Sequence, residues 1–317
     1  MKLELLGGID FLEVKAPGPF TDVIYDAISS VKNTGAKQQG YELMVDLEPY
    51  GLPAMLHYGS RWTQQHKLQV KAVGEKGFTE IIDIIGSVFD GDPSEAVIMR
   101  LDAKVDTDYP VQYFKEHARI PYKRNKGEFS CLKHKESNLK SVETLEIGKR
   151  PNLSRFYDKL AEQRHDYRVY CNRMKKYGKE PEAFESRYGH PESGPILTRV
   201  ERQFGGGRVP ELVGTIGKLI ANAEQFNPFE GIEFLKAVKM AAISESVSLR
   251  QRIVGEFLHE KNQEWGRQIL ESWVRKHAGS NATRFLKAFN GYMSVSPLEP
   301  PDLNGLFHKE FMKQVKA

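Results

Sequence analysis

Cysteine is scarce in this chain of 317 residues, which contains only Cys131 and Cys171. Two thiols cannot build the disulfide framework of a small secreted scaffold or a zinc site of four thiolates. No run approaches the ~20 consecutive apolar residues that a membrane-spanning helix needs. Acidic side chains, Glu4 and Asp10, interrupt the N-terminal stretch where a signal peptide would have its apolar segment. These absences favour a cytoplasmic protein.

A phosphate-binding loop for ATP or GTP is also missing. The stretch from Gly214 to Lys218 has the wrong spacing, and Leu219 stands where such a loop needs Ser or Thr. Low-complexity tracts are absent, and an apolar fraction of 40% can support a packed core. At roughly 100–200 residues per domain, we expect one large or two modest domains.

The charge is nearly balanced overall, with 46 Lys and Arg against 42 Asp and Glu and a net charge of +4. Residues 115–180, however, hold 18 Lys and Arg against nine Asp and Glu. This surplus of nine leaves the rest of the chain with five net negative charges, because the total is +4. A basic middle favours contact with a polyanion such as nucleic acid. The alternative interpretation is a solvated, lysine-rich surface.

Strand and turn patterns dominate the first two hundred residues, and helical periodicity dominates the last hundred. Strands are expected at residues 8–14, 41–45, 54–58, 67–73 and 96–106, with a helix from Phe78 to Val88. Helices are expected at 212–226, 247–274 and 282–292, with Gly279 as a C-cap and a weakly helical tail after Pro297. The glycine-rich seam from Phe204 to Pro210 divides the chain into predicted domains 1–210 and 211–317. Strands that alternate with helices favour an α+β or α/β architecture.

Charged and apolar residues alternate along the strand expected at 96–106. Arg100, Asp102, Lys104 and Asp106 therefore share one face, opposite an apolar face that can pack on a core. Carboxylates on such a face could hold a hard divalent cation, which prefers oxygen ligands. The alternative is a half-exposed sheet with cross-strand ion pairs.

A strand–turn–strand pattern runs from Thr144 to Lys159. In its return strand, Arg155, Tyr157 and Lys159 are expected on one face, and the two cations should lower the pKa of the Tyr157 hydroxyl from about 10. A phenolate beside cations is a reasonable nucleophile for a phosphodiester. The alternative is a packed ring with a wet hydroxyl, the commoner fate of a tyrosine.

A further strand is expected from Leu197 to Phe204, with Arg199, Glu201 and Gln203 on one face. Glu201 could join Asp102 as a metal ligand if the two strands were neighbours.

The order of these motifs resembles a known family. The motifs are Gly8 to Leu12, Arg100-Leu101-Asp102, Thr144 to Arg150, Arg155 to Lys159, and Thr198 to Glu201. They are similar, in this order, to those of the replication initiator proteins of rolling-circle plasmids and filamentous phages, the replication initiation factor family. The resemblance spans about residues 8–205.

The resemblance implies a DNA nicking and joining enzyme. In that family a tyrosine attacks one strand at the replication origin, forms a 5′-phosphotyrosyl link and frees a 3′-hydroxyl that primes synthesis. The implied fold is α+β, an antiparallel sheet flanked by helices and related to the His-hydrophobic-His endonucleases, followed here by a helical C-terminal region. By motif match Tyr157 is the nucleophile, and Asp102 and Glu201 hold Mg²⁺ or Mn²⁺. Glu146 would be a third ligand, and Asp106 is an alternative from the same strand face.

Basic residues would serve the same reaction. Arg150, Arg155 and Lys159 would neutralise phosphate oxygens. Further DNA contacts are expected from residues that stand in a basic stretch with interspersed aromatic residues: Lys149, Arg164, Arg168, Lys175 and Lys176. Tyr167 and Tyr170, in the same stretch, are rival nucleophiles on chemical grounds.

Three partners follow from the resemblance: origin DNA, single-stranded or in a hairpin at the nick site, a separate helicase, and a second copy of the chain. The His-hydrophobic-His metal pair of the wider superfamily is absent from this sequence, so a metal site would have to be built from carboxylates. A non-catalytic DNA-binding regulator on the same scaffold is the alternative function.

Overall fold

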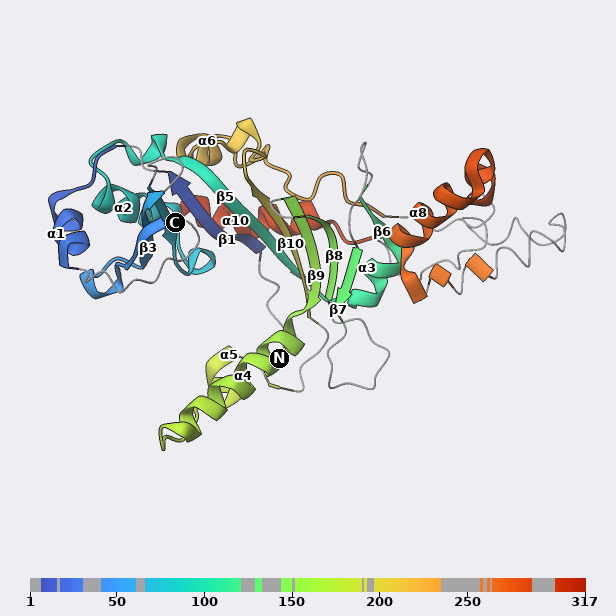
Figure 1. The fold of residues 1–317 in the computed structure, drawn as a ribbon, viewed down its shortest axis with the longest axis horizontal. Coiled ribbons are helices and arrows are strands. Elements are labelled where there is room, and N and C mark those ends of the chain that lie inside the picture. The colour runs from blue at the N-terminus through green and yellow to red at the C-terminus, as the bar shows by residue number, and fades with distance from the viewer. Residues whose placement is uncertain are drawn as a thin grey trace.

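The computed structural model describes residues 7–15, 18–30, 41–60, 66–120, 129–132, 144–149, 152–189, 191–192, 197–234, 257–258, 261–262, 264–286 and 300–317. Nine strands in this part of the chain form one large sheet, in the order β2-β3-β4-β1-β5-β10-β9-β8-β7 (Figure 1). All the pairings within it are antiparallel. Helices pack beside this sheet, so the expected α+β class with an antiparallel sheet is confirmed.

The strands of the large sheet are β1 (Gly7–Lys15), β2 (Tyr41–Asp46), β3 (Ala54–Ser60), β4 (Lys67–Val70), β5 (Val97–Thr107), β7 (Phe129–Leu132), β8 (Thr144–Lys149), β9 (Asn152–Asp158) and β10 (Thr198–Gly205). A small second sheet pairs β6 (Ala118–Arg119) with β11 (Glu233–Phe234). The helices are α1 (Asp22–Ser30), α2 (Phe78–Val88), α3 (Val111–His117), α4 (Lys159–Lys176), α5 (Phe184–Tyr188), α6 (Ile216–Ala221), α8 (Arg267–Ala278) and α10 (Leu303–Lys316).

The apolar face of the central strands forms the core. Leu101, Ala103 and Val105 of β5 are buried, as the alternation of the sequence predicts. They belong to a cluster that also contains Phe78 from α2 and Phe311 from α10. Burial on this face fixes which residues of β5 must point the other way, because a strand alternates between its two faces.

The C-terminal helix α10 is part of this core. It lies along β1, where the Ile9 amide donates to Gln314 Oε1 at 2.9 Å, and it buries Phe307 and Phe311 completely. Because the sequence predicts only a weakly helical tail here, this helix is more regular than expected. Residues on both sides of the predicted boundary at 210 contribute to one core, with Val213 in the same cluster as Leu101. The division into two domains stays a prediction.

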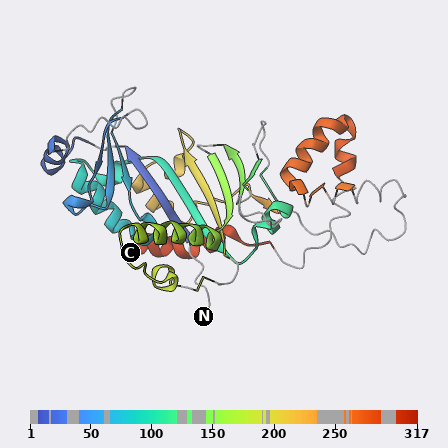
Figure 2. The ribbon, with the colours of Figure 1, turned by 60° about the horizontal axis from the view of Figure 1, so that its bottom comes forward.

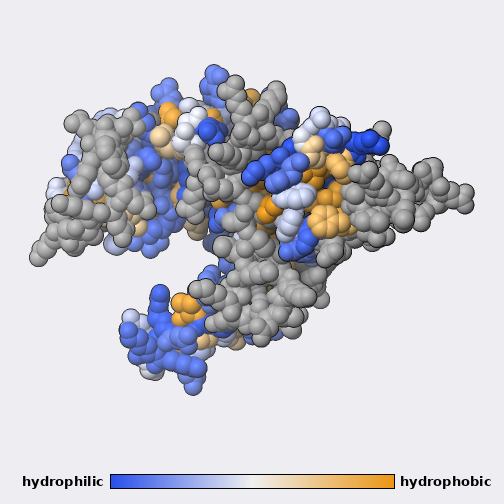
Figure 3. Space-filling view, turned by 45° about the vertical axis from the view of Figure 1, so that its right-hand side comes forward, coloured by the Kyte–Doolittle hydropathy of each residue, from blue (hydrophilic) through white to orange (hydrophobic). Residues whose placement is uncertain are grey.

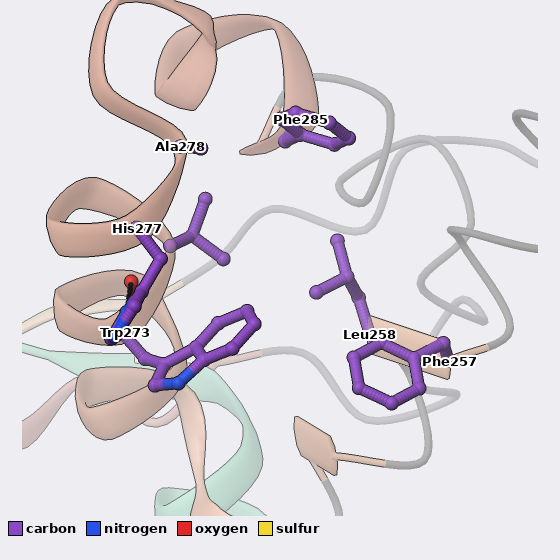
Figure 4. A pocket seen from close by; sticks show the side chains of 7 residues that line it. Phe257, Leu258, Trp273, His277, Ala278 and Phe285 are labelled. Carbon is purple, nitrogen blue, oxygen red and sulfur yellow. Dashed lines mark hydrogen bonds between the residues drawn. The ribbon is translucent and has the colours of Figure 1, made fainter.

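A separate apolar cluster lies in the region of α8. It consists of Leu258, Leu270, Val274, Ala282 and Leu286. Beside it is a pocket of about 270 Å³ whose lining includes Phe257, Trp273 and Phe285 (Figure 4). The predicted C-cap of α8 is confirmed, because Gly279 follows its last residue with a φ of 52°.

Several predicted elements have different ends in the structure. The hairpin of β2 and β3, the helix α2 and the strand β5 lie where the sequence predicts them. The strand expected to reach Val73 stops at Val70, because Ala72 adopts a left-handed conformation and a 3₁₀ helix begins at Val73. The helix expected at 212–226 is confined to α6, which spans six residues. Residues 247–256 and 287–292 of the other expected helices lie outside the described residues.

The most consequential difference concerns Lys159. The sequence predicts it on the return strand beside Tyr157, but β9 ends at Asp158 and Lys159 begins α4. The cause is local, because the Asp158 side chain accepts a hydrogen bond from the Ala161 amide at 2.9 Å and so caps the helix. Figure 1 shows α4 projecting from this end of β9, away from the sheet, and Figure 2 shows the helix along its whole length. None of the described helices is both long and apolar enough to cross a membrane.

Candidate functional site

A buried polar face lies where β5, β10 and β9 pair. Glu201 on β10 is opposite Lys104 on β5 and opposite Arg155 on β9. Directly opposed residues share a face of a sheet, so the charged face of β5 continues across β10 onto β9. We call this set of side chains the polar face: Asp102, Lys104, Asp106, Arg155, Tyr157, Arg199, Glu201 and Gln203. All but Arg155 are buried.

Asp102 is on β5 and Glu201 is on β10, and these two strands pair directly. The two carboxylates can therefore lie close together, as a shared metal site would require. Asp102 is opposite Gln203, two residues along β10 from Glu201. Asp102 and Glu201 are therefore diagonal neighbours on the polar face, about 7–8 Å apart at the backbone by the usual geometry of such pairs.

Tyr157 lies within this face and contacts Glu201. Its side chain is only 8% exposed, and its hydroxyl donates to Glu201 Oε1 at 2.6 Å. Arg155 Nη2 lies 2.6 Å from the other oxygen, Glu201 Oε2. Glu201 thus joins the predicted nucleophile to one of the predicted phosphate-neutralising cations.

The electrostatic environment of Tyr157 is opposite to the one expected from the sequence. Burial, followed by the nearby Glu201 carboxylate, raises the pKa of the Tyr157 hydroxyl well above its usual value. The predicted lowering is therefore wrong, because it assumed two cations beside the phenol on an open strand. Instead, Lys159 Nζ lies 5.9 Å from the centre of the Tyr157 ring and pairs with Glu162.

Each buried carboxylate of the polar face is paired with a cation. Arg199 binds Asp106 through two hydrogen bonds, from Nε at 2.7 Å and from Nη2 at 2.9 Å. Arg100 Nε donates to Asp102 Oδ1 at 3.0 Å. The pair of Arg199 and Asp106 joins β10 to β5, so a cross-strand ion pair of the kind considered as the alternative for β5 is present, although this face is buried rather than half-exposed. Arg100 and Asp102 pair within β5.

Burial raises the pKa of two carboxyl groups on the polar face, those of Glu201 and Asp102. It raises the pKa of Glu201 above its ordinary value, although Arg155 and the Tyr157 hydroxyl act in the opposite direction. Burial also raises the pKa of Asp102, against the effect of Arg100. Both side chains thus hold protons more readily than exposed carboxylates do.

Asp10 joins this face although no role is expected for it from the sequence. It stands on β1 at an irregularity in the pairing with β5, between Ile9 and Phe11, and pairs with Lys104. Burial alone would raise the pKa of Asp10, but Lys104 and Arg199 lower it overall. Simple alternation gives no signal for Asp10, because the irregularity interrupts the alternation at that position.

Glu146 and Lys149 lie on β8, one strand nearer the sheet edge than β9. Glu146 is on β8, directly opposite Arg155, and is partly buried. Lys149 is the last residue of β8. Arg150 lies outside the residues that the structure describes.

The other predicted DNA-binding residues lie on α4, away from the polar face. Arg168, Lys175 and Lys176 are exposed. The Arg164 guanidinium donates to the Glu192 carbonyl oxygen at 2.9 and 2.6 Å.

The rival nucleophiles also lie on α4, and both contact the segment before α5. The Tyr167 hydroxyl donates to the Glu182 carbonyl oxygen at 2.8 Å, and the Tyr170 hydroxyl accepts from the Glu182 amide at 3.2 Å. Of the three candidate tyrosines, Tyr157 is the one that lies on the polar face.

The fit of this face to a metal ion is mixed. Asp10, Asp102 and Glu201 carry the oxygen donors that Mg²⁺ and Mn²⁺ prefer, and the charge of Asp10 helps to raise the pKa of both Asp102 and Glu201. Within the described ranges, no three His, Cys, Asp or Glu side chains are grouped closely enough to hold an ion. The donor chemistry therefore fits, but among the described residues these carboxylates are not grouped around one point, and each is paired with a basic side chain.

Comparisons with known proteins add one structural likeness. No protein-family model matches the chain, and no curated protein is significantly similar to it. A solved structure, titled as a rolling circle replication initiator protein from Geobacillus stearothermophilus, is 12% identical to this chain. The match covers 93% of this chain and 100% of that chain, with a TM-score of 0.36. That protein is of the class that the motif order resembles, but a TM-score this low assigns no residue or activity to this chain.

Proposed function

We propose that the chain is a rolling-circle replication initiator that nicks and rejoins DNA through Tyr157. The observation that carries the proposal is the contact of the Tyr157 hydroxyl with Glu201, at 2.6 Å, on the polar face. A nucleophilic hydroxyl needs an acceptor for its proton within hydrogen-bond distance. Glu201 meets that condition, and burial makes its carboxylate a better proton acceptor than an exposed one.

The reaction transfers a phosphoryl group without net hydrolysis. Tyr157 Oη forms a bond to the phosphorus of the scissile phosphodiester, and its proton passes to Glu201. The bond between phosphorus and the 3′-oxygen breaks, and that oxygen takes up the proton held by Glu201, directly or through water, to give a 3′-hydroxyl and restore the carboxylate. The DNA 5′-phosphate is then esterified to Tyr157, so attack by a 3′-hydroxyl can reverse the step without ATP.

Basic side chains around Tyr157 would stabilise the charge on the phosphate. Arg155 is 30% exposed at its side chain and lies on the same face, two residues from the nucleophile. Lys159 follows Tyr157 by two residues in the sequence, and its Nζ lies 5.9 Å from the centre of the Tyr157 ring. Guanidinium and ammonium groups at such positions can bind phosphate oxygens as negative charge develops in the transition state.

A divalent cation is part of the proposal. Asp102 and Glu201, with Asp10 as a third carboxylate, would have to come closer together than they lie here to hold Mg²⁺ or Mn²⁺, and the ion would then polarise the scissile phosphate as a Lewis acid.

The proposal is tested by following DNA onto the protein. A pool of single-stranded oligonucleotides with a random centre and a labelled 3′ end is incubated with the full chain and Mn²⁺. A 5′-phosphotyrosyl link attaches the labelled fragment to the protein, so the label should migrate with the chain on a denaturing gel. Tyr157→Phe should lose this adduct, since it removes the attacking oxygen and little volume.

Two matched controls share the chemistry of that substitution. Tyr167→Phe and Tyr170→Phe also remove one phenolic oxygen each, and both should keep the adduct. An adduct that persists in Tyr157→Phe would show that the nucleophile is another residue.

A non-catalytic DNA-binding regulator on the same scaffold is the second candidate. The observation in its favour is that the carboxylates of the polar face are already paired, with Asp106 bound by Arg199 and Asp102 by Arg100. A network satisfied in this way can serve structure alone. This candidate predicts that the wild-type chain binds DNA but forms no labelled adduct with Mg²⁺ or Mn²⁺.

A further inference from the structure

Helix α4 extends from the nucleophile-bearing strand and buries little of its surface. Leu160, in its first turn, is the one residue of the helix that is buried. The helix has 18 residues, which corresponds to a length of about 27 Å. In Figure 3 the far end of α4 and α5 stands apart from the rest of the molecule and is covered mainly by hydrophilic residues. Outside the side that packs on α5, the surface of α4 is suited to water or to a polar partner.

One side of α4 is already occupied by α5 and the segment before it. The rings of Tyr167 and Phe184 lie 5.2 Å apart, and the Arg187 guanidinium lies 4.3 Å from the ring of Tyr170. This packing, with the hydrogen bonds of both tyrosines to Glu182, fixes the orientation of the helix about its own axis.

The opposite side of α4 carries an exposed stripe with a distinct chemistry. At 100° per residue, the residues that fall on this stripe are His165, Arg168, Val169, Asn172 and Lys176. All five are exposed. Arg173 and Lys175, also exposed, flank the stripe on its two sides. We call these residues the α4 stripe and its flanking cations.

The residue types of the stripe match the base edges of duplex DNA. Arg binds the O6 and N7 atoms of guanine through two hydrogen bonds, Asn binds the N6 and N7 atoms of adenine, and a small apolar side chain contacts the thymine methyl. Arg168 and Asn172 are four residues apart, so they stack one turn above the other, with Val169 beside them. The major groove, about 12 Å wide, admits one helix.

Charge favours the same partner. From Lys159 to Lys176 the helix has six Lys and Arg against two Asp and Glu, a net charge of +4. Arg173 on one side of the stripe and Lys175 on the other are placed to reach the two phosphate backbones that border a groove.

We propose that α4 reads duplex DNA in the major groove beside the nick, with Arg168 and Asn172 contacting bases and Arg173 and Lys175 contacting phosphates. The inference rests on the proposed function for the identity of the polyanion. Because α4 begins two residues after Tyr157, a duplex held by α4 lies next to the strand that is cut. The helix would thus select the DNA sequence at which Tyr157 acts.

The test is a selection from a library of duplexes with a random 20-base-pair centre, using the full chain. The wild type should enrich one motif. Asn172→Ala and Arg168→Ala should each lose preference at one base pair of that motif and bind the wild-type motif about five- to a hundredfold more weakly. Both positions are exposed and alanine favours helix, so the variants should keep the helical signal in circular dichroism.

Further variants distinguish contacts to bases, which give sequence preference, from contacts to phosphates, which do not. Arg173→Ala and Lys175→Ala should weaken binding to every duplex by a similar factor and make it less sensitive to salt. Lys309→Ala, which removes an exposed lysine on α10, should change neither motif nor affinity.

Two results would overturn the inference. In the first, the wild type enriches no motif. In the second, Asn172→Ala and Arg168→Ala both enrich the same motif as the wild type. Tyr157→Phe should enrich the wild-type motif, because α4 is intact in it. A wild type that selects a duplex motif but never forms an adduct on single-stranded DNA would refute the nicking activity and leave the role of α4 standing.

Discussion

Tyr157 and Glu201 are hydrogen-bonded at 2.6 Å in a buried setting that raises the pKa of both side chains. The Tyr157 hydroxyl is kept protonated by burial and by the adjacent carboxylate. In a pH titration followed by phenolate absorbance, wild type and Tyr157→Phe should therefore give the same signal through the range near pH 10 where ordinary tyrosines ionise. After unfolding in guanidinium chloride, the wild type should show one phenolate more than the variant. A difference of one phenolate near pH 10 in the folded proteins would mean that Tyr157 is not held in this way.

The pair of Arg199 and Asp106 is the most deeply buried ion pair on the polar face, with side chains 8% and 2% exposed. Removing one partner of such a pair leaves an uncompensated buried charge. Arg199→Ala should lower the free energy of unfolding by about 3–5 kcal/mol in a urea titration. Lys71→Ala, which opens the exposed pair with Asp46, should cost less than about 1 kcal/mol. A small and equal loss in both variants would contradict the burial of the Arg199 pair.

The residues of the polar face could be predicted in part from the sequence. Alternation places Asp102 and Asp106 on one face of β5, and Glu201 and Arg199 on one face of β10. Their partners could not be predicted, because the pairing of Glu201 with Arg155 and Tyr157 depends on β10 lying between β5 and β9. That neighbourhood is a property of the sheet order, which no single strand pattern contains. For the same reason, the sequence predicts a lowered pKa for Tyr157, whereas the pKa is raised in the folded protein.

At the scale of elements, α10 packs against β1, which comes from the other end of the chain, and contributes to the core of the sheet. Phe311 is fully buried against Phe78 and Phe307, and its loss would leave a cavity in the core. Phe311→Ala should lower the free energy of unfolding by about 3–5 kcal/mol. Lys309→Ala on the exposed side of the same helix should change it by no more than about 0.5 kcal/mol. Equal effects of the two substitutions would show that α10 does not pack on the core.

Element ends were harder to predict than element types. The sequence extends β9 through Lys159 because Arg155, Tyr157 and Lys159 alternate. Asp158, a favourable N-cap residue, is the signal that marks the start of α4 instead. The tail illustrates the opposite case. Phe307 and Phe311 are four residues apart, the spacing of a buried helical face, but Pro297 and the pair Pro300-Pro301 before them obscure the pattern.

At the scale of the whole molecule, the polar face is the proposed site of DNA cleavage, and helix α4 is the proposed site of DNA sequence recognition. If Asp102 and Glu201 hold a metal, EDTA should abolish adduct formation, and Mn²⁺ or Mg²⁺ should restore it. Asp102→Asn should reduce the rate by about tenfold or more, the loss usual for groups that support a metal site. Asp46→Asn, which changes an exposed carboxylate on β2, should keep the wild-type rate. Adduct formation that is unaffected by EDTA would remove the metal from the proposal and leave Tyr157 as the nucleophile.

The central claim concerns a single bond, between Tyr157 Oη and a DNA phosphorus. The direct measurement is peptide mapping by mass spectrometry of the adduct formed with single-stranded oligonucleotides and Mn²⁺, after nuclease has trimmed the DNA. We predict that the remaining nucleotide is attached to Tyr157. A nucleotide found on Tyr167 or Tyr170, or no covalently modified peptide at all, would contradict the account.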